Sequence, residues 1–186
     1  MDLTVKDILS KLFQDHVYEK QVKLCVANSF YWDKHFESDF ISISKAGYVS
    51  EYEIKMTRAD FKNDFKKFHG KEYKKWQLDL FEKRGIEQQK YYKHDLLKNG
   101  KSGIKHFYFC CPEGLLTKED LPDHVGLLEF SVPNNKWHEF ATYKTTKRAP
   151  KLPNAQKASE EDELRIREAQ KWQYVKSKMI KFERVS

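Results

Sequence analysis

Two alternating segments, Phe36–Ser44 and Tyr48–Met56, are separated by only three residues, and this arrangement constrains the fold more than any other feature of the chain. Side chains along a strand point alternately to its two faces. Hairpin loops of three residues favour glycine at the last position, where this chain has Gly47. The pattern therefore predicts a β-hairpin in which Ser44 lies opposite Tyr48.

This predicted register brings acidic side chains together across the hairpin. Counting back from the turn places Asp39 opposite Glu53 and Glu37 opposite Lys55. On the second strand, Glu51, Glu53 and Lys55 project from one face. A loop shorter by one residue would move Asp39 to the other face and separate it from these residues. The proposed cluster therefore depends on the length of the turn.

Two carboxylates directly opposite each other repel, and a bound cation removes that repulsion. Because the predicted cluster contains no His or Cys, these hard oxygen ligands favour Mg²⁺ or Mn²⁺ over zinc. We expect Asp39 and Glu53 to bind the metal, and Lys55 to orient the attacking water or stabilise the transition state. Glu51 is a candidate ligand for a second metal, and Glu37 is a candidate partner for Lys55.

The same residues carry a resemblance to a known family. Asp39, a gap of thirteen residues and then Glu53-Ile54-Lys55 resembles the PD-(D/E)XK signature of the restriction-endonuclease-like nuclease superfamily. Residues 51–64 are similar to the MmcB-like DNA-repair branch, and residues 111–115 and 121–127 resemble strand ends of that branch. The resemblance implies a mixed central sheet flanked by helices, with Asp39 and Glu53 as metal ligands and Lys55 as the catalytic lysine.

The chain departs from the family pattern at two points. Ser38 stands where the family name has proline. Some members have a further metal-binding acid on the first helix, for which Asp15 and Glu19 are the candidates here. By resemblance, the expected function is hydrolysis of DNA phosphodiester bonds in repair, recombination or phage DNA processing.

Periodicity and turn residues predict a single α/β fold. Thr57 and Ser159 are expected to cap helices, with Phe61, Phe65 and Phe68 along the first of these. We predict helices at 4–20, from 58 and from 160, and strands at 22–26, 36–44, 48–56, 104–111, 126–132 and 137–145. The predicted division is a nuclease-like core over 1–150, containing a peripheral helical insertion at 71–103, and a linker with a charged C-terminal helix over 151–186.

Composition favours a polyanionic partner. The chain has 35 Lys and Arg against 28 Asp and Glu, giving a net charge of +7. Nucleic acid is the first candidate and an anionic membrane surface the second. No apolar run approaches the roughly 20 residues that span a bilayer. The three cysteines include the adjacent pair Cys110 and Cys111, which argues against a disulfide framework and favours the cytoplasm.

Basic residues follow the predicted site and are expected to bind nucleic acid, either by charge or with bases stacked on nearby aromatics. They are Arg58, Lys62, Lys66, Lys67, Lys71 and Lys74. DNA is the expected partner, and RNA stays open. A solvated helix face would show the same lysines.

Other interpretations stay open at this point. The chain could be a non-cleaving nucleic-acid-binding module of the same fold, acting as an adaptor, or a protein-binding factor with a basic surface that serves solubility. On the last helix, Trp172, Val175, Met179 and Phe182 form a 3-4-3 seam. This seam would either pack on the core or form a homodimer contact.

Overall fold

The computed structural model describes residues 2–31, 36–69, 80, 83–84, 91–132 and 141–183. Its centre is a mixed six-stranded sheet in the order β1-β2-β3-β6-β7-β8. The strands are β1 Leu24–Phe30, β2 Glu37–Ile43, β3 Val49–Ile54, β6 His106–Pro112, β7 Gly126–Ser131 and β8 Thr142–Lys147. The first three strands pair antiparallel, β3, β6 and β7 are parallel, and β8 returns antiparallel to β7.

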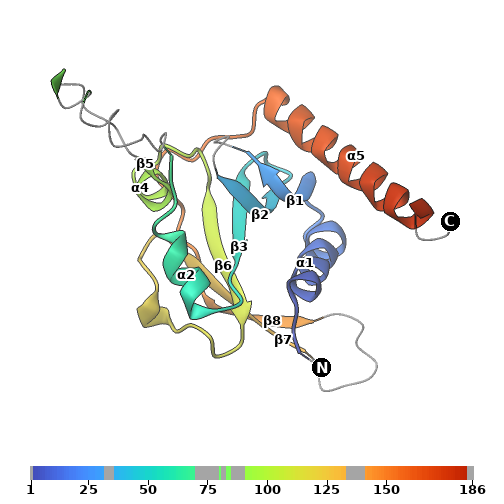
Figure 1. Cartoon of the computed structure of the whole chain (residues 1–186), viewed down its shortest axis with the longest axis horizontal. Coiled ribbons are helices and arrows are strands. Elements are labelled where there is room, and N and C mark those ends of the chain that lie inside the picture. Colours follow the sequence, from blue (N-terminus) through green and yellow to red (C-terminus); the bar gives the residue numbers. More distant parts are fainter. Residues whose placement is uncertain are drawn as a thin grey trace.

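Helices cover both faces of this sheet (Figure 1). They are α1 Val5–Gln14 with a π-helical extension Asp15–Glu19, α2 Arg58–Asp64, α4 Lys93–Lys98, a 3₁₀ turn Lys118–Asp120 and α5 Glu160–Glu183. A small second sheet pairs β4 Phe68–His69 with β5 Tyr91–Tyr92. The predicted mixed α/β fold with an appended C-terminal helix is confirmed.

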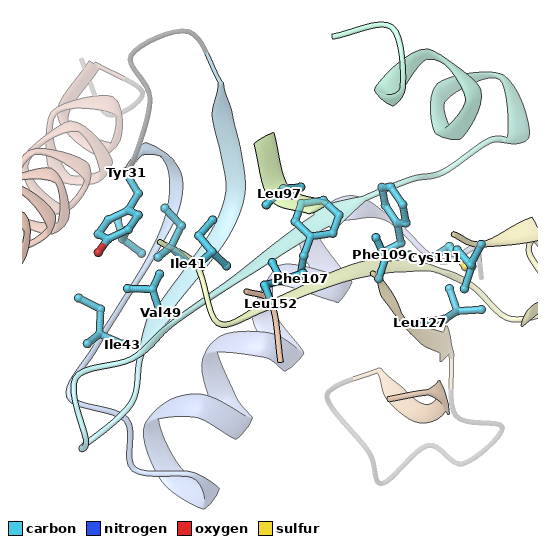
Figure 2. Packing of buried hydrophobic residues seen from close by; sticks show 14 of the residues in the cluster. Tyr31, Ile41, Ile43, Val49, Leu97, Phe107, Phe109, Cys111, Leu127 and Leu152 are labelled. Carbon is cyan, nitrogen blue, oxygen red and sulfur yellow. The ribbon is translucent and has the colours of Figure 1, made fainter. Parts of the chain in front are cut away.

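Alternation along the strands produces two hydrophobic cores, one on each face of the sheet. On one face Ile8 and Leu12 of α1 pack against side chains that include Phe40. On the other face Phe61 of α2 and Leu97 of α4 pack over the sheet, and Figure 2 shows part of this cluster. Because both faces are covered, any polar group on β2 or β3 is buried unless it lies at a strand end.

The hairpin has the predicted register. Gly47 adopts a positive φ of 88°, and the amide of Ser44 donates to the carbonyl of Tyr48 over 2.9 Å. From there the cross-strand pairs run as far as Phe40 opposite Tyr52. The next position in this register holds Asp39 and Glu53.

The helix after the hairpin begins as predicted and ends earlier. Thr57 accepts a hydrogen bond from the amide of Asp60, which caps the first turn of α2. The helix ends at Asp64, and Phe68 belongs to β4 instead of continuing the helical stripe. This early end leaves Asp64 facing the sheet, where it is fully buried.

Within the range predicted as a peripheral insertion, the described end is not peripheral. Lys93 and Leu97 of α4 are completely buried against the sheet. They lie one helical turn apart and therefore share a face. The lysine-rich composition of this range suggested a solvent-exposed helix, and it gave no indication that the Lys93 side chain is buried.

The segment after residue 150 contributes to the core through Leu152 of the predicted linker and Ile166 of α5. The side-chain amides of Gln170 and Gln173 donate to the carbonyls of Cys25 and Ala27 on the edge strand β1.

The two described residues of the predicted apolar seam do not pack on the core. Trp172 is 66% exposed and Val175 is 41% exposed. Met179 and Phe182 have side chains outside the described part. The face that meets β1 carries glutamines because the carbonyls of an edge strand need donors. No helix in the described part of the chain has the length and apolarity to cross a membrane.

Candidate active site

A carboxylate pair lies where the hairpin strands open toward the start of α2. One oxygen of Asp39 accepts a hydrogen bond of 2.7 Å from the amide of Ile54, next to Glu53. This bond ties the Asp39 side chain to β3 just past the last cross-strand pair. Burial raises the pKa of Asp39 to about 6, and the negative charge of Glu53 adds to the rise. The predicted repulsion between these two acids is therefore present.

Three lysines surround Glu53, which is almost completely buried. The ammonium groups of Lys55 and Lys67 each lie 3.0 Å from Oε2, and Lys93 binds Oε1. Burial by itself raises the pKa of Glu53, but the charges of these lysines outweigh it and lower the pKa overall. Glu53 is therefore an ionised carboxylate with both oxygens engaged.

A third carboxylate, Asp64, joins the cluster from the end of α2. Its Oδ1 lies 2.7 Å from the ammonium groups of both Lys55 and Lys67, and its Oδ2 lies 2.9 Å from His94 Nε2. Burial raises the pKa of Asp64, but the His94 hydrogen bond and the lysine charges lower it well below its usual range. Asp64, Lys93 and His94 are not among the residues predicted for the site.

Glu51 lies deeper on the same face of β3 and is completely buried. Its Oε1 accepts a hydrogen bond of 2.8 Å from the hydroxyl of Ser38 and lies 2.7 Å from the ammonium of Lys93. The serine that stands in place of the family proline thus holds an acidic side chain of the cluster. Lys93 connects Glu51 with Glu53.

Lys55 is fixed between two carboxylates. Its ammonium contacts Glu53 and Asp64, and its backbone amide donates to the carbonyl of Cys110 on β6. Burial lowers the pKa of Lys55, but the two adjacent negative charges raise it above the usual value. Lys55 therefore stays protonated and can act as a hydrogen-bond donor and a positive charge, not as a base.

Among the described residues, four carboxylates of the cluster face three ammonium groups, which leaves one negative charge uncompensated when Asp39 is ionised. In the part of the chain that the structure describes, no lysine or arginine forms an ion pair with Asp39. Asp39 also lines an open pocket of about 510 Å³ together with Glu37, Lys66 and Lys67. A cation entering this pocket would meet the unneutralised carboxylate first.

The donor set fits Mg²⁺ with one rearrangement. No group of three or more His, Cys, Asp or Glu side chains among the described residues is arranged to hold a metal. Mg²⁺, however, needs only one or two carboxylates and keeps several waters. Asp39 offers one carboxylate, and Glu53 offers a second if Lys67 withdraws. The side chain of Lys67 is 38% exposed, so it can turn toward solvent, whereas Lys55 and Lys93 are buried.

The secondary acidic candidates have different surroundings from those predicted. Glu37 is exposed on the pocket wall and lies opposite Phe30 of β1. It is not the predicted partner of Lys55, whose ammonium contacts Glu53 and Asp64. Asp15 is buried on the α1 side of the sheet and forms an ion pair with Lys11. It therefore cannot reach Glu53 through the intervening sheet. Glu19 is on the same side and is also close to Lys11.

The basic candidates separate into different roles. Arg58 forms two hydrogen bonds of 3.0 Å with the carboxylate of Asp120, so its guanidinium is already engaged. Lys62 and Lys66 are exposed, and Lys66 lines the pocket beside Asp39. Lys67 belongs to the acidic cluster, as shown above. Lys71 and Lys74 lie outside the described residues.

Comparisons with known proteins address the fold alone. No protein-family model matches the chain, and no curated protein matches it. Among solved structures, the chain is similar to the SPO1766 protein of unknown function from Silicibacter pomeroyi. The TM-score is 0.53 at 16% sequence identity, covering 97% of this chain and 94% of that one. This likeness extends over nearly the whole chain, so the arrangement of sheet and helices recurs in another protein.

Proposed function

We propose that this protein is a divalent-metal-dependent nuclease that hydrolyses DNA phosphodiester bonds at the open end of the β2–β3 hairpin. The observation that carries the proposal is the placement of Asp39 beside Glu53, with Lys55 held against Glu53 and a pocket open to solvent at Asp39. Chemistry at phosphorus depends mainly on positioning and on charge, so a short set of fixed groups suffices.

In this proposal each residue has a separate task. Asp39 and Glu53 would hold Mg²⁺ or Mn²⁺, which when bound lowers the pKa of a coordinated water and neutralises charge on the scissile phosphate. Lys55 donates a hydrogen bond to the attacking water or to the phosphate oxygen that gains charge. Lys66 and Lys67 lie at the pocket wall, where they would meet the phosphate backbone.

A second candidate function has an observation in its favour. Both oxygens of Glu53 are already bonded to lysines, so the buried carboxylate is neutralised without a metal. A cluster of this kind would also suit a nucleic-acid-binding module of the same fold that does not cut. The uncompensated charge of Asp39 favours the nuclease over this alternative.

The test is cleavage of labelled DNA, comprising duplex, flap, junction and single-stranded forms, in Mg²⁺, Mn²⁺ or EDTA. We expect wild-type protein to cut only with metal, and Asp39→Asn and Lys55→Ala to lose cutting while still binding DNA. Lys6→Ala removes the same charge as Lys55→Ala from an exposed position on α1 and should keep cutting. Lys55→Ala leaves buried acids unpaired and can impair folding, whereas Asp39→Asn does not.

If wild-type protein cuts none of the substrates yet binds them with a strong salt dependence, the binding module is the better description. If it binds no nucleic acid at low salt, both functions are excluded.

A further inference from the structure

Two histidines extend the acidic cluster away from the pocket that contains Asp39. His94 Nε2 lies 2.9 Å from Asp64 Oδ2, and His94 Nδ1 lies 3.0 Å from His124 Nε2. On the opposite side of the same carboxylate, Asp64 Oδ1 lies 2.7 Å from the ammonium of Lys55. The contacts therefore form an unbroken chain from His124 through His94 and Asp64 to Lys55.

The donor and acceptor roles in this chain follow from the charges at its ends. Because Asp64 is ionised, it accepts from Lys55 and from His94 Nε2. Burial is the main cause that lowers the pKa of His124 to about 4, and neighbouring positive charges, among them Lys98 and Lys147, add to the effect. In either charge state of its ring, His94 donates from Nε2 to Asp64, while its Nδ1 shares a hydrogen bond with Nε2 of His124.

Aromatic packing holds the His94 ring in place. The ring stacks on Phe65 at a centroid distance of 4.3 Å and meets Phe107 edge-on at 5.5 Å. Only 7% of the His94 side chain is exposed. Its Nε2 therefore keeps one direction, toward Asp64.

The hydrogen bond with His94 fixes the orientation of the Asp64 carboxylate. Two lysines share Asp64 Oδ1, the buried Lys55 and the partly exposed Lys67. With His94 holding Oδ2, the carboxylate cannot rotate to follow Lys67 when that side chain turns toward solvent or toward phosphate. Without His94, the contact between Asp64 and Lys55 would depend on the position of the partly exposed Lys67 side chain.

We propose that His94 is a positioning residue for Lys55, acting through Asp64, and that His124 helps to hold the His94 ring by contacting its other nitrogen. His124 lines a separate pocket of about 650 Å³, together with Phe65, Lys98 and Leu152. The chain of contacts thus connects Lys55 with a second pocket, which shares no lining residue with the pocket of Asp39. The inference rests on the proposed nuclease function only for its kinetic consequence, since the geometry stands without it.

The test compares His94→Leu, which removes both ring nitrogens, with His94→Gln, whose amide can still donate to Asp64. His124→Leu removes the outer contact at a half-buried position, where folding is less at risk. His106→Gln is the control, because His106 is a half-buried histidine that contacts the carbonyl of Pro150 and not the cluster. Two properties are measured: the ¹H–¹⁵N signal of the Lys55 ammonium group, and kcat and KM for the DNA substrate that the wild type cuts best.

We expect His94→Leu to broaden or shift the Lys55 ammonium signal and to lower kcat about tenfold, with KM nearly unchanged. His94→Gln should recover most of both properties, His124→Leu should lie between, and His106→Gln should match the wild type. A His94→Leu protein with a wild-type ammonium signal and kcat would overturn the proposal. Equal losses in His94→Leu and His94→Gln would also overturn it, because His94 would then matter only for packing.

The two proposals fail separately. If the wild type cuts no DNA, the nuclease function is wrong, and the ammonium signal still decides whether His94 positions Lys55. If His94→Leu does not fold, the comparison of His94→Gln and His124→Leu with the wild type decides the same question.

Discussion

Asp39 and Glu53 lie next to each other at the open end of the hairpin, and among the described residues lysines form ion pairs with Glu53 but not with Asp39. This asymmetry explains why the pKa of Asp39 rises to about 6 while that of Glu53 falls. It also separates the two acids by role. Glu53 is buried and held by lysines, whereas Asp39 has no ion-pair partner in the described part of the chain.

Asp39→Asn should therefore stabilise the metal-free protein while it abolishes cleavage. The folded-state pKa is raised, so stability from Asp39 is present below pH 4 and is lost as the pH rises through about 6. At pH 7.5 the charged carboxylate destabilises the fold, and Asn removes that charge while keeping an acceptor for Ile54. We expect the free energy of unfolding in urea with EDTA to rise by roughly 1 kcal/mol.

The matched control is Glu37→Gln, which removes an exposed carboxylate from the wall of the same pocket. Its unfolding free energy should match that of the wild type. A fall in stability for Asp39→Asn would mean that the Asp39 charge has a partner and that the case for a cation there is weak.

Lys67→Gln should bind Mn²⁺ more tightly than the wild type and DNA more weakly. Its ammonium lies 3.0 Å from Glu53 Oε2 and competes with a metal for that oxygen. Removal of the positive charge should lower the dissociation constant for Mn²⁺ about three- to tenfold, measured by isothermal titration calorimetry. Lys62→Gln removes a charge outside the cluster and should leave Mn²⁺ affinity unchanged. Equal Mn²⁺ affinity in Lys67→Gln and the wild type would place the metal away from Glu53.

Lys93→Met should destabilise the fold by about 3 to 5 kcal/mol, because it leaves buried acids without their cation. Lys93 is completely buried and contacts both Glu51 and Glu53. Adding Glu51→Gln to Lys93→Met should recover part of the loss, since one of the unpaired charges is then removed. Urea unfolding of the single and double variants measures both effects. A double variant less stable than Lys93→Met would show that Glu51 is not held by Lys93.

Acid should weaken the fold through a histidine on the opposite face of the sheet. His16 Nδ1 lies 2.7 Å from the carbonyl of Leu12, and its Nε2 lies 2.9 Å from the hydroxyl of Tyr52. Burial lowers the pKa of His16 to about 4, and the charge of Lys20 adds to the effect. A depressed pKa means that the stability is present above the unfolded value of 6.5 and is lost as the pH falls through about 4.

Between pH 7 and pH 5 we expect His16 to account for a loss of about 1 to 2 kcal/mol in the free energy of unfolding. His16→Gln cannot titrate and should reduce this pH dependence, although its stability at pH 7 will be lower. An unchanged slope in His16→Gln would assign the acid sensitivity to other groups, of which His124 is the first candidate.

The hairpin was predictable from sequence because its determinants are local. Alternation over a few residues and Gly47 at the turn fix which side chains face one another, and the register of Asp39 with Glu53 follows. The cap at Thr57 is local in the same way.

Asp64, Lys93 and His94 were missed because their role depends on contacts between distant segments. About forty residues separate Lys93 from Glu53 along the chain, and nothing in the lysine-rich sequence around Lys93 distinguishes it from a surface residue. A signal was present in the helical spacing. Lys93 is one turn before the buried Leu97, and Asp64 is one turn after the buried Phe61, so both polar residues lie on an apolar face.

The contact between α5 and β1 has a consequence for the association of the protein with itself. In the described sheet β1 is an edge strand, and an uncovered edge is a template for a strand from another molecule. The side chains of Gln170 and Gln173 donate hydrogen bonds to two carbonyls of β1. Because these donors belong to a helix, no new strand edge is created on which the sheet could continue. The last helix thus acts as a terminator of sheet growth, and a chain shortened before residue 160 would expose a strand able to recruit its own copies.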